Sequence, residues 1–91
     1  MASPGDLLKI LLRRISPPFF TIRIRDGEAM LQNGKMTPAF LHDCGLIAKR
    51  SGIRSGWIWG IREGASIKLD FSGTIEDGDR QRFRNILGVH A

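Results

Sequence analysis

The sequence predicts an α+β fold, a two-layer sandwich in which a four-stranded, mainly antiparallel sheet carries two helices on one face. Three observations lead to this prediction. Apolar and polar residues alternate in four short segments, two-residue turn signals join these segments into two hairpins, and a helical pattern follows each hairpin. The predicted element order is therefore ββαββα. A chain of 91 residues can bury one small core.

Residues 1–16 are expected to form an amphipathic or flexible arm, and residues 17–91 a single domain. Ser16-Pro17-Pro18 separates the two, because proline cannot extend a helix and biases the preceding residue toward extended conformations. The arm pairs an apolar stripe with basic residues, which is typical of a helix at a lipid surface. The alternative is an arm that packs on its own domain or frays. The candidate membrane-surface residues are Leu8, Lys9, Leu11, Leu12, Arg13, Arg14 and Ile15.

The first hairpin begins with a strand in which Phe20, Ile22 and Ile24 alternate with polar residues. This period of two is typical of a half-buried strand. Asp26-Gly27 is a strong signal for a two-residue turn, so residues 28–32 are expected to return as the partner strand.

A capped helix is expected between Thr37 and Gly52. Thr37 is a favourable N-cap residue, Pro38 suits the first helical position, and Gly52 suits the left-handed conformation after the last turn. The apolar side of this helix consists of Phe40, Leu41, Cys44, Ile47 and Ala48. This side is expected to cover the sheet.

The second hairpin follows the same pattern. Trp57, Trp59 and Ile61 alternate with the residues between them and are expected to face the helices. Glu63-Gly64 supplies the turn, and residues 66–71 form the returning strand.

A second helix is expected from Thr74, with Asp77 in a variant of the capping box, to Gly88. The turn segments of the two halves also match, Ile24-Arg25-Asp26-Gly27 in the first and Ile61-Arg62-Glu63-Gly64 in the second. The match suggests that one ββα unit has been duplicated.

One face of the sheet is left without helices by this alternation. It is expected to carry Thr21, Arg23, Arg25, Glu28, Met30, Ile58, Arg62, Ser66, Lys68 and Asp70. Basic groups outnumber acidic ones on it, and the chain has a formal charge of +5, which favours anionic partners. The candidate nucleic-acid-binding residues are Arg23, Arg25, Arg62 and Lys68 on the sheet, with Lys49, Arg50 and Arg54 at its margin.

The sequence contains no pattern typical of catalysis, such as a nucleophile elbow, a Walker loop or a dinucleotide fingerprint. His42, Asp43 and Cys44 are consecutive on a helix, where neighbours diverge by about 100° and do not converge on one metal. We therefore expect no enzyme, no cofactor and no metal site. The single cysteine, on the apolar side of its helix, favours a reducing compartment. The expected location is cytoplasmic, either free or peripheral at a membrane.

Four short motifs resemble a known family. They are the D-G hairpin, P-A-F-L at the start of the first helix, F-S-G before the last helix, and R-F-R-N near the end. Together they run from Ile22 to Leu87 and resemble small uncharacterised bacterial proteins catalogued as a domain of unknown function. No activity or ligand is established for that family, so the resemblance implies no function. Some members carry a hydrophobic N-terminal membrane segment, whose place residues 7–15 occupy here.

Two functions remain open from the sequence. One is a noncatalytic interaction module that binds another protein through the uncovered sheet face or a sheet edge. The alternative is a nucleic-acid-binding domain that uses the basic sheet face. Peripheral membrane contact is compatible with either.

Overall fold

The computed structural model describes residues 4–15 and 18–90. Of the predicted break at Ser16-Pro17-Pro18, the first two residues lie outside the described part, as do the side chains of Leu12, Arg13, Arg14 and Ile15. In chain order the elements are α1 (Pro4–Ile15), β1 (Phe20–Arg25), β2 (Glu28–Gly34), α2 (Pro38–Ser51), β3 (Ser55–Glu63), β4 (Ser66–Phe71) and α3 (Asp77–His90). The order after α1 is the predicted ββαββα.

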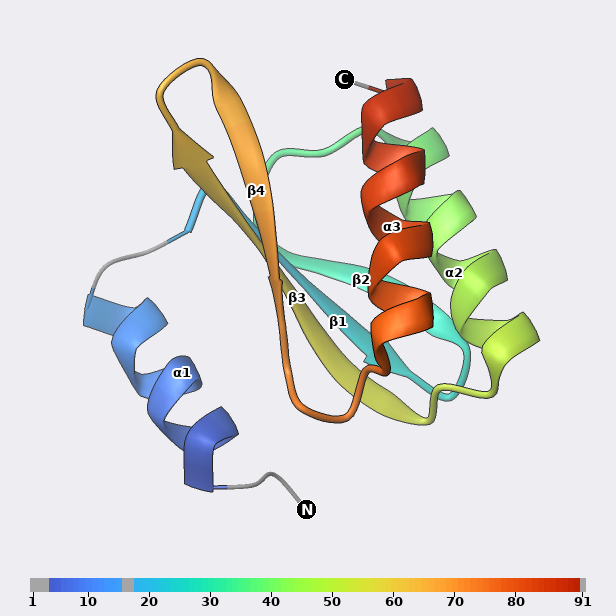
Figure 1. Ribbon diagram of the computed structural model, residues 1–91, viewed down its shortest axis with the longest axis horizontal. Coiled ribbons are helices and arrows are strands. Elements are labelled where there is room, and N and C mark those ends of the chain that lie inside the picture. Colours follow the sequence, from blue (N-terminus) through green and yellow to red (C-terminus); the bar gives the residue numbers. More distant parts are fainter. Residues whose placement is uncertain (1–3, 16–17, 91) are drawn as a thin grey trace.

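The described strands form one antiparallel sheet in the order β2-β1-β3-β4. Figure 1 shows α2 and α3 side by side on one face of this sheet, which confirms the predicted two-layer sandwich. Each half is a hairpin followed by a helix, and the central strands β1 and β3 join the halves. The same figure places α1 on the opposite side of the sheet, so that side is not left without a helix.

α2 forms as its sequence predicts. Thr37 Oγ1 accepts a hydrogen bond from the Phe40 N–H at 3.2 Å, and Gly52 ends the helix with φ of 68°. The N–H of Ile53 then returns to the Ala48 carbonyl at 2.9 Å, and Ile53 is buried. Both ends of the helix are thus satisfied by local hydrogen bonds.

The core lies between the sheet and the two helices. Its buried members are Phe20, Ile22, Ile24, Phe40, Cys44, Ala48, Ile53, Ile58, Leu69, Phe71, Ile75, Phe83 and Leu87. All three inward residues of β1 are fully buried, as the alternation predicts. β1 thus forms the centre of the core.

The side-chain directions of β3 are the reverse of those predicted. Ile58 is fully buried in the core, whereas Trp57 and Trp59 lie on the other side of the sheet. The expected inward direction of Trp57, Trp59 and Ile61 is therefore wrong. The expected outward direction of Ile58 and Arg62 is wrong for the same reason, because successive residues of a strand point to opposite faces.

Two glycines explain this reversal. The Phe20 ring lies directly over Gly60, and a Cβ atom at Gly60 would collide with it. At Gly56 a Cβ atom would stand 3.0 Å from the Ile75 side chain. The helix side of β3 must be small at these two positions, so the bulky indole rings occupy the other side.

α3 begins later and ends later than predicted. Thr74 does not cap it, because its Oγ1 lies 2.9 Å from Ser72 Oγ in the turn that precedes the helix. The helix also continues through Gly88 to His90, whose Nε2 lies 2.7 Å from Asp43 Oδ2 on α2. This contact holds the last turn against α2, so Gly88 does not end the helix.

α1 is attached to the sheet through polar residues. Asp6 Oδ1 accepts a hydrogen bond from the Gly73 N–H at 2.8 Å, and Lys9 Nζ donates to the Phe71 carbonyl at 2.8 Å. Lys9 Nζ also lies 3.4 Å from Asp70 Oδ1. Three leucines are instead exposed to solvent, Leu7 by 59%, Leu8 by 57% and Leu11 by 56%. In the described part of α1, polar residues contact the domain while leucines face solvent, the reverse of a usual surface helix.

We predict that Gly60→Ala destabilises the protein by about 1–3 kcal/mol, because the added methyl group must displace the Phe20 ring. Gly88→Ala is the matched control, since no atom lies within 4 Å of its Cβ position, and alanine is favoured inside a helix. Urea unfolding measures both variants. An equal loss of stability in the two would contradict the packing of Phe20 on Gly60.

The stability of the protein is expected to fall at alkaline pH because of Cys44. Burial, assisted by the negative charge of Asp43, raises the pKa of the Cys44 thiol from 9.0 to about 12. Between these values the thiol ionises in the unfolded chain but stays protonated in the folded one, so rising pH favours unfolding. At about pH 10 the free energy of unfolding is lower than at neutral pH by roughly 1.4 kcal/mol. Urea unfolding at both pH values measures it, and Cys44→Ala should lack this component.

Candidate functional site

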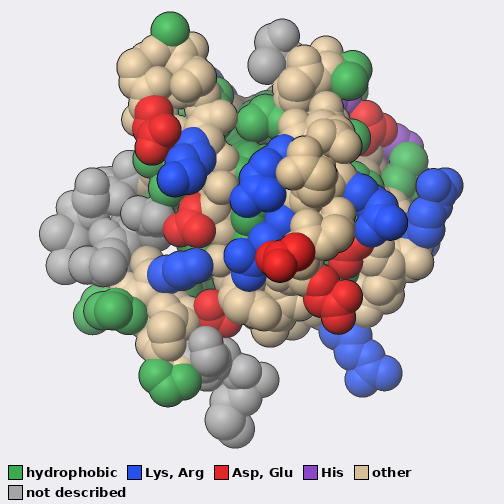
Figure 2. Space-filling model, in the orientation of Figure 1, with side chains coloured by type: hydrophobic (Ala, Val, Ile, Leu, Met, Phe, Trp, Pro, Cys, Tyr) green, Lys and Arg blue, Asp and Glu red, His purple; other side chains and the backbone are tan. Residues whose placement is uncertain are grey.

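The basic residues predicted to bind nucleic acid do not form one surface. Three of them lie on the side of the sheet opposite α2 and α3, namely Arg23, Arg25 and Lys68. Three others lie where α2 ends and the loop to β3 runs, namely Lys49, Arg50 and Arg54. Arg62 is on the helix side, with its guanidinium carbon 5.0 Å from the centre of the Phe19 ring. Figure 2 shows Lys and Arg side chains interspersed with Asp and Glu on the face in view, without a single basic patch.

The two tryptophans form a stacked pair on the α1 side of the sheet. Their rings are parallel to within 1° with centroids 6.2 Å apart, and the Arg23 guanidinium carbon lies 4.4 Å from the centre of the Trp57 ring. A platform for stacking bases needs exposed rings. Trp59, however, is only 1% exposed, and Arg23 Nε is buried without a hydrogen-bond partner. Trp59 is therefore buried, while Trp57 and Arg23 are partly buried and are held together by a cation–π contact.

The side chains of His42, Asp43 and Cys44 diverge around α2. Cys44 is buried in the core, Asp43 contacts His90 of α3, and His42 is exposed. Within residues 4–15 and 18–90, no group of three or more His, Cys, Asp or Glu residues is arranged to hold a metal ion.

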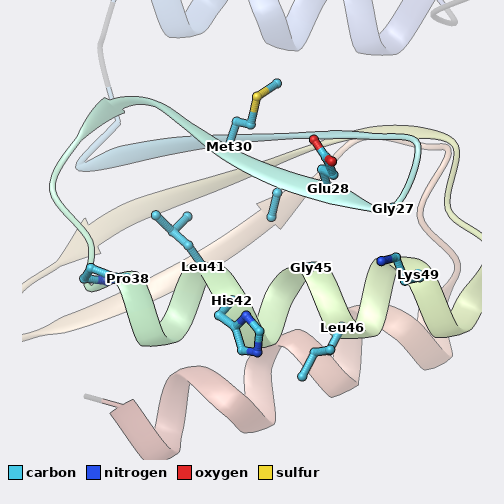
Figure 3. A pocket seen from close by; sticks show the side chains of 10 residues that line it. Gly27, Glu28, Met30, Pro38, Leu41, His42, Gly45, Leu46 and Lys49 are labelled. Atoms are coloured by element: carbon cyan, nitrogen blue, oxygen red, sulfur yellow. The ribbon is translucent and has the colours of Figure 1, made fainter.

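A groove of about 460 Å³ runs between β2 and α2. It is lined by Gly27, Glu28, Ala29, Met30, Pro38, Leu41, His42, Gly45, Leu46 and Lys49. Figure 3 shows Leu41 pointing from α2 toward β2, whereas Met30 points to the other side of the strand. At Gly45 a Cβ atom would lie 3.8 Å from the Ala29 nitrogen, so the missing side chain lets α2 approach the β2 main chain. The centre of the groove is therefore apolar and narrow, and charged side chains lie toward one end of it.

β2 and β4 are the two edges of the sheet, and side chains cover one end of the β4 edge, at Phe71. The Phe71 N–H donates to Asp70 Oδ1 at 2.9 Å, and the Phe71 carbonyl accepts from Lys9. The next outward amide, that of Gly73, donates to Asp6. Side chains thus satisfy the outward main-chain groups at this end of β4, and two of them come from α1.

The edge of β2 is not covered in this way. Among the side-chain hydrogen bonds of the described residues, none reaches the main chain of β2. The Asp26 N–H donates to the Arg54 carbonyl on the β3 side, so the main chain of Arg25 faces β2. Antiparallel alternation then turns the N–H and C=O groups of Ala29 and Leu31 outward. β2 therefore presents an uncovered strand edge directly beside the groove.

The groove could not be recognised from residue types alone, but one signal for it is present in the sequence. Gly45 interrupts the predicted helix pattern, although glycine costs about 1 kcal/mol relative to alanine inside a helix. Such a glycine indicates a close approach of another segment. The strand that approaches it is β2.

The predicted membrane-surface residues of α1 are only partly arranged as expected. Leu8 and Leu11 are exposed on the outer side of the helix, whereas Lys9 is bound to β4. The remaining four, Leu12, Arg13, Arg14 and Ile15, have side chains outside the described part of the structure. Within that part, every helix is too short or too polar to cross a bilayer.

Comparison with known proteins identifies the family. No curated protein and no solved structure matches the chain. One protein-family model, described as "Protein of unknown function (DUF3634)", matches residues 8–91, which include the whole sheet, α2 and α3. This match confirms the resemblance found in the motifs of the sequence. The chain therefore belongs to the DUF3634 family of proteins of unknown function.

Proposed function

We propose that this domain is a noncatalytic interaction module that binds an extended segment of another protein along the edge of β2. The observation that carries the proposal is the unequal treatment of the two sheet edges. Side chains bond the outward main-chain groups at the end of β4. Among the described residues, no side chain bonds the outward main-chain groups of β2, which lie beside a groove. Uncovered strand edges are templates for pairing with another chain, and proteins usually protect them.

The bound segment would extend the sheet as an additional strand. Its main chain would exchange hydrogen bonds with the outward groups of Ala29 and Leu31. Every second side chain would point toward α2, where Leu41 offers an apolar surface in the groove. The groove volume of about 460 Å³ is large enough for such side chains.

The distribution of charge supports a protein partner over the nucleic-acid alternative. Strong nucleic-acid binding requires several basic groups that contact neighbouring phosphates. Here the seven candidate residues are divided among the α1 side of the sheet, its helix side and the end of α2. Of the two tryptophans that would stack on bases, Trp59 is buried and Trp57 is partly buried.

The proposal can be tested with short random-sequence peptides displayed on phage and selected against the full chain. We expect the selected peptides to carry apolar residues at alternate positions. Gly45→Leu fills the groove and should weaken their binding by about tenfold or more. Ala29→Pro removes an outward N–H and should do the same.

Gly88→Leu is the matched control for the groove variant, because it makes the same change on α3, where no atom lies within 4 Å of the added Cβ atom. The assignment to β2 would be contradicted if Gly45→Leu and Gly88→Leu reduced peptide binding equally, or if neither variant reduced it. Binding of mixed RNA or DNA oligomers that weakens steeply with salt would instead favour the nucleic-acid alternative.

We also propose that α1 contacts a lipid surface, which accounts for its exposed leucines. Three large apolar side chains on neighbouring positions of one helix are each more than half exposed. Such a stripe is suited to the boundary between headgroups and acyl chains. The positive charge of the chain favours a surface of acidic lipids.

We predict that the full chain sediments with vesicles that contain acidic lipid and less with neutral ones. Replacing Leu8 and Leu11 by glutamate should abolish this sedimentation, because charged groups do not enter the acyl region. Replacing Leu46 and Val89 by glutamate is the matched control, since both are exposed apolar residues on other helices. Equal sedimentation of the two double variants would refute the assignment to α1.

A further inference from the structure

The edge of β4 is complementary to itself. The main chain of Phe71 faces away from β3. Its N–H and C=O groups bond to side chains, whereas the N–H of the following Ser72 donates to the Trp57 carbonyl of β3. Ile67 and Leu69 must turn the same way, since the direction repeats at every second residue. These three residues also point their side chains toward the helices. Lys68 and Asp70 point to the other side.

A second copy can pair with this edge in one favourable antiparallel register. With Leu69 opposite Leu69 of the other copy, Ile67 lies opposite Phe71 and Lys68 lies opposite Asp70, each pair twice. Apolar residues then face the helix side, and both charge pairs attract. The neighbouring registers place Lys68 opposite Lys68 or Asp70 opposite Asp70, which is unfavourable. The same register aligns the outward main-chain groups of both strands.

α1 occupies the contacts that this second copy requires. Lys9 Nζ lies 2.8 Å from the Phe71 carbonyl and 3.4 Å from Asp70 Oδ1. In the paired register, an N–H of the second copy would donate to the Phe71 carbonyl of the first. Lys68 of the second copy would contact the Asp70 carboxylate of the first. Lys9 thus holds the position of Lys68 from a second molecule. Because Leu7, Leu8 and Leu11 are exposed rather than packed, the contacts of Asp6 and Lys9 are what fasten the described part of this helix.

We propose that two copies of this chain associate through their β4 edges when α1 moves away, and that Asp6 and Lys9 hold α1 in the position that prevents it. Association would join the two sheets into one continuous sheet with two-fold symmetry. On the helix side, a groove of about 400 Å³ between β4 and α3 leaves room for side chains of the second copy. Ile67, Leu69 and Leu87 line that groove, so it suits apolar side chains.

Sedimentation equilibrium of full-chain variants tests the proposal. Replacing Asp6 by alanine and Lys9 by methionine removes the acceptor of the Gly73 N–H and the donor to the Phe71 carbonyl, and so releases α1 without removing it. This double variant should dimerise at least about tenfold more tightly than the unchanged chain, because it frees an unpaired strand edge that can pair with a second copy. Adding Lys68→Glu places like charges opposite each other twice and should return it to a monomer. Arg25→Glu is the matched control, since Arg25 lies on the same side of the sheet but on β1.

A charge-swap experiment identifies the register. In the released background, Lys68→Glu and Asp70→Lys should each prevent dimers alone, and mixing the two variants should restore a heterodimer. A released variant that is folded by circular dichroism yet stays monomeric would overturn the proposal. Two other outcomes would also overturn the proposal, because both would point to the β2 edge. One is association that is prevented by Ala29→Pro but not by Lys68→Glu, and the other is the formation of open-ended oligomers instead of dimers.

Discussion

The packing of the Phe20 ring on Gly60 determines how the two halves of this protein meet. These residues face each other across the central strand pair, β1 and β3, and the ring fills the space that a side chain at Gly60 would need. With the ring in that position, β3 must turn Ile58 into the core and both indoles to the opposite side. The identity of both faces of the sheet therefore depends on one contact between an aromatic ring and a missing side chain.

Much of the fold could be predicted because local signals and packing agree. Thr37, Pro38 and Gly52 define α2 through hydrogen bonds to neighbours along the chain, and Asp26-Gly27 closes a hairpin through its own backbone preference. β3 could not be assigned correctly, because apolar residues lie on both of its faces and alternation then carries no direction. The matching turn segments of the two halves also mislead, since Ile24 points into the core and Ile61 away from it.

The candidate groove was harder to predict than the fold because it depends on tertiary contacts. Leu41 belongs to the predicted apolar side of α2, but only the position of β2 makes it part of a groove. The uncovered edge of β2 becomes evident by comparison with β4, whose protection comes from residues far away in the sequence, Asp6 and Lys9. The sequence led to the expectation that a sheet edge binds a partner, but it could not say which of the two edges.

The two-part construction of the sheet has a consequence for how the chain folds. Each hairpin and its helix are built from near neighbours in the sequence, whereas Phe20 reaches Gly60 only after the intervening loop has closed. Most of the entropy lost in loop closure is therefore concentrated in a single event, the meeting of the two halves. Long-range pairing of this kind slows folding. The rate of folding should accordingly respond more to changes at the meeting of β1 and β3 than to changes within either hairpin.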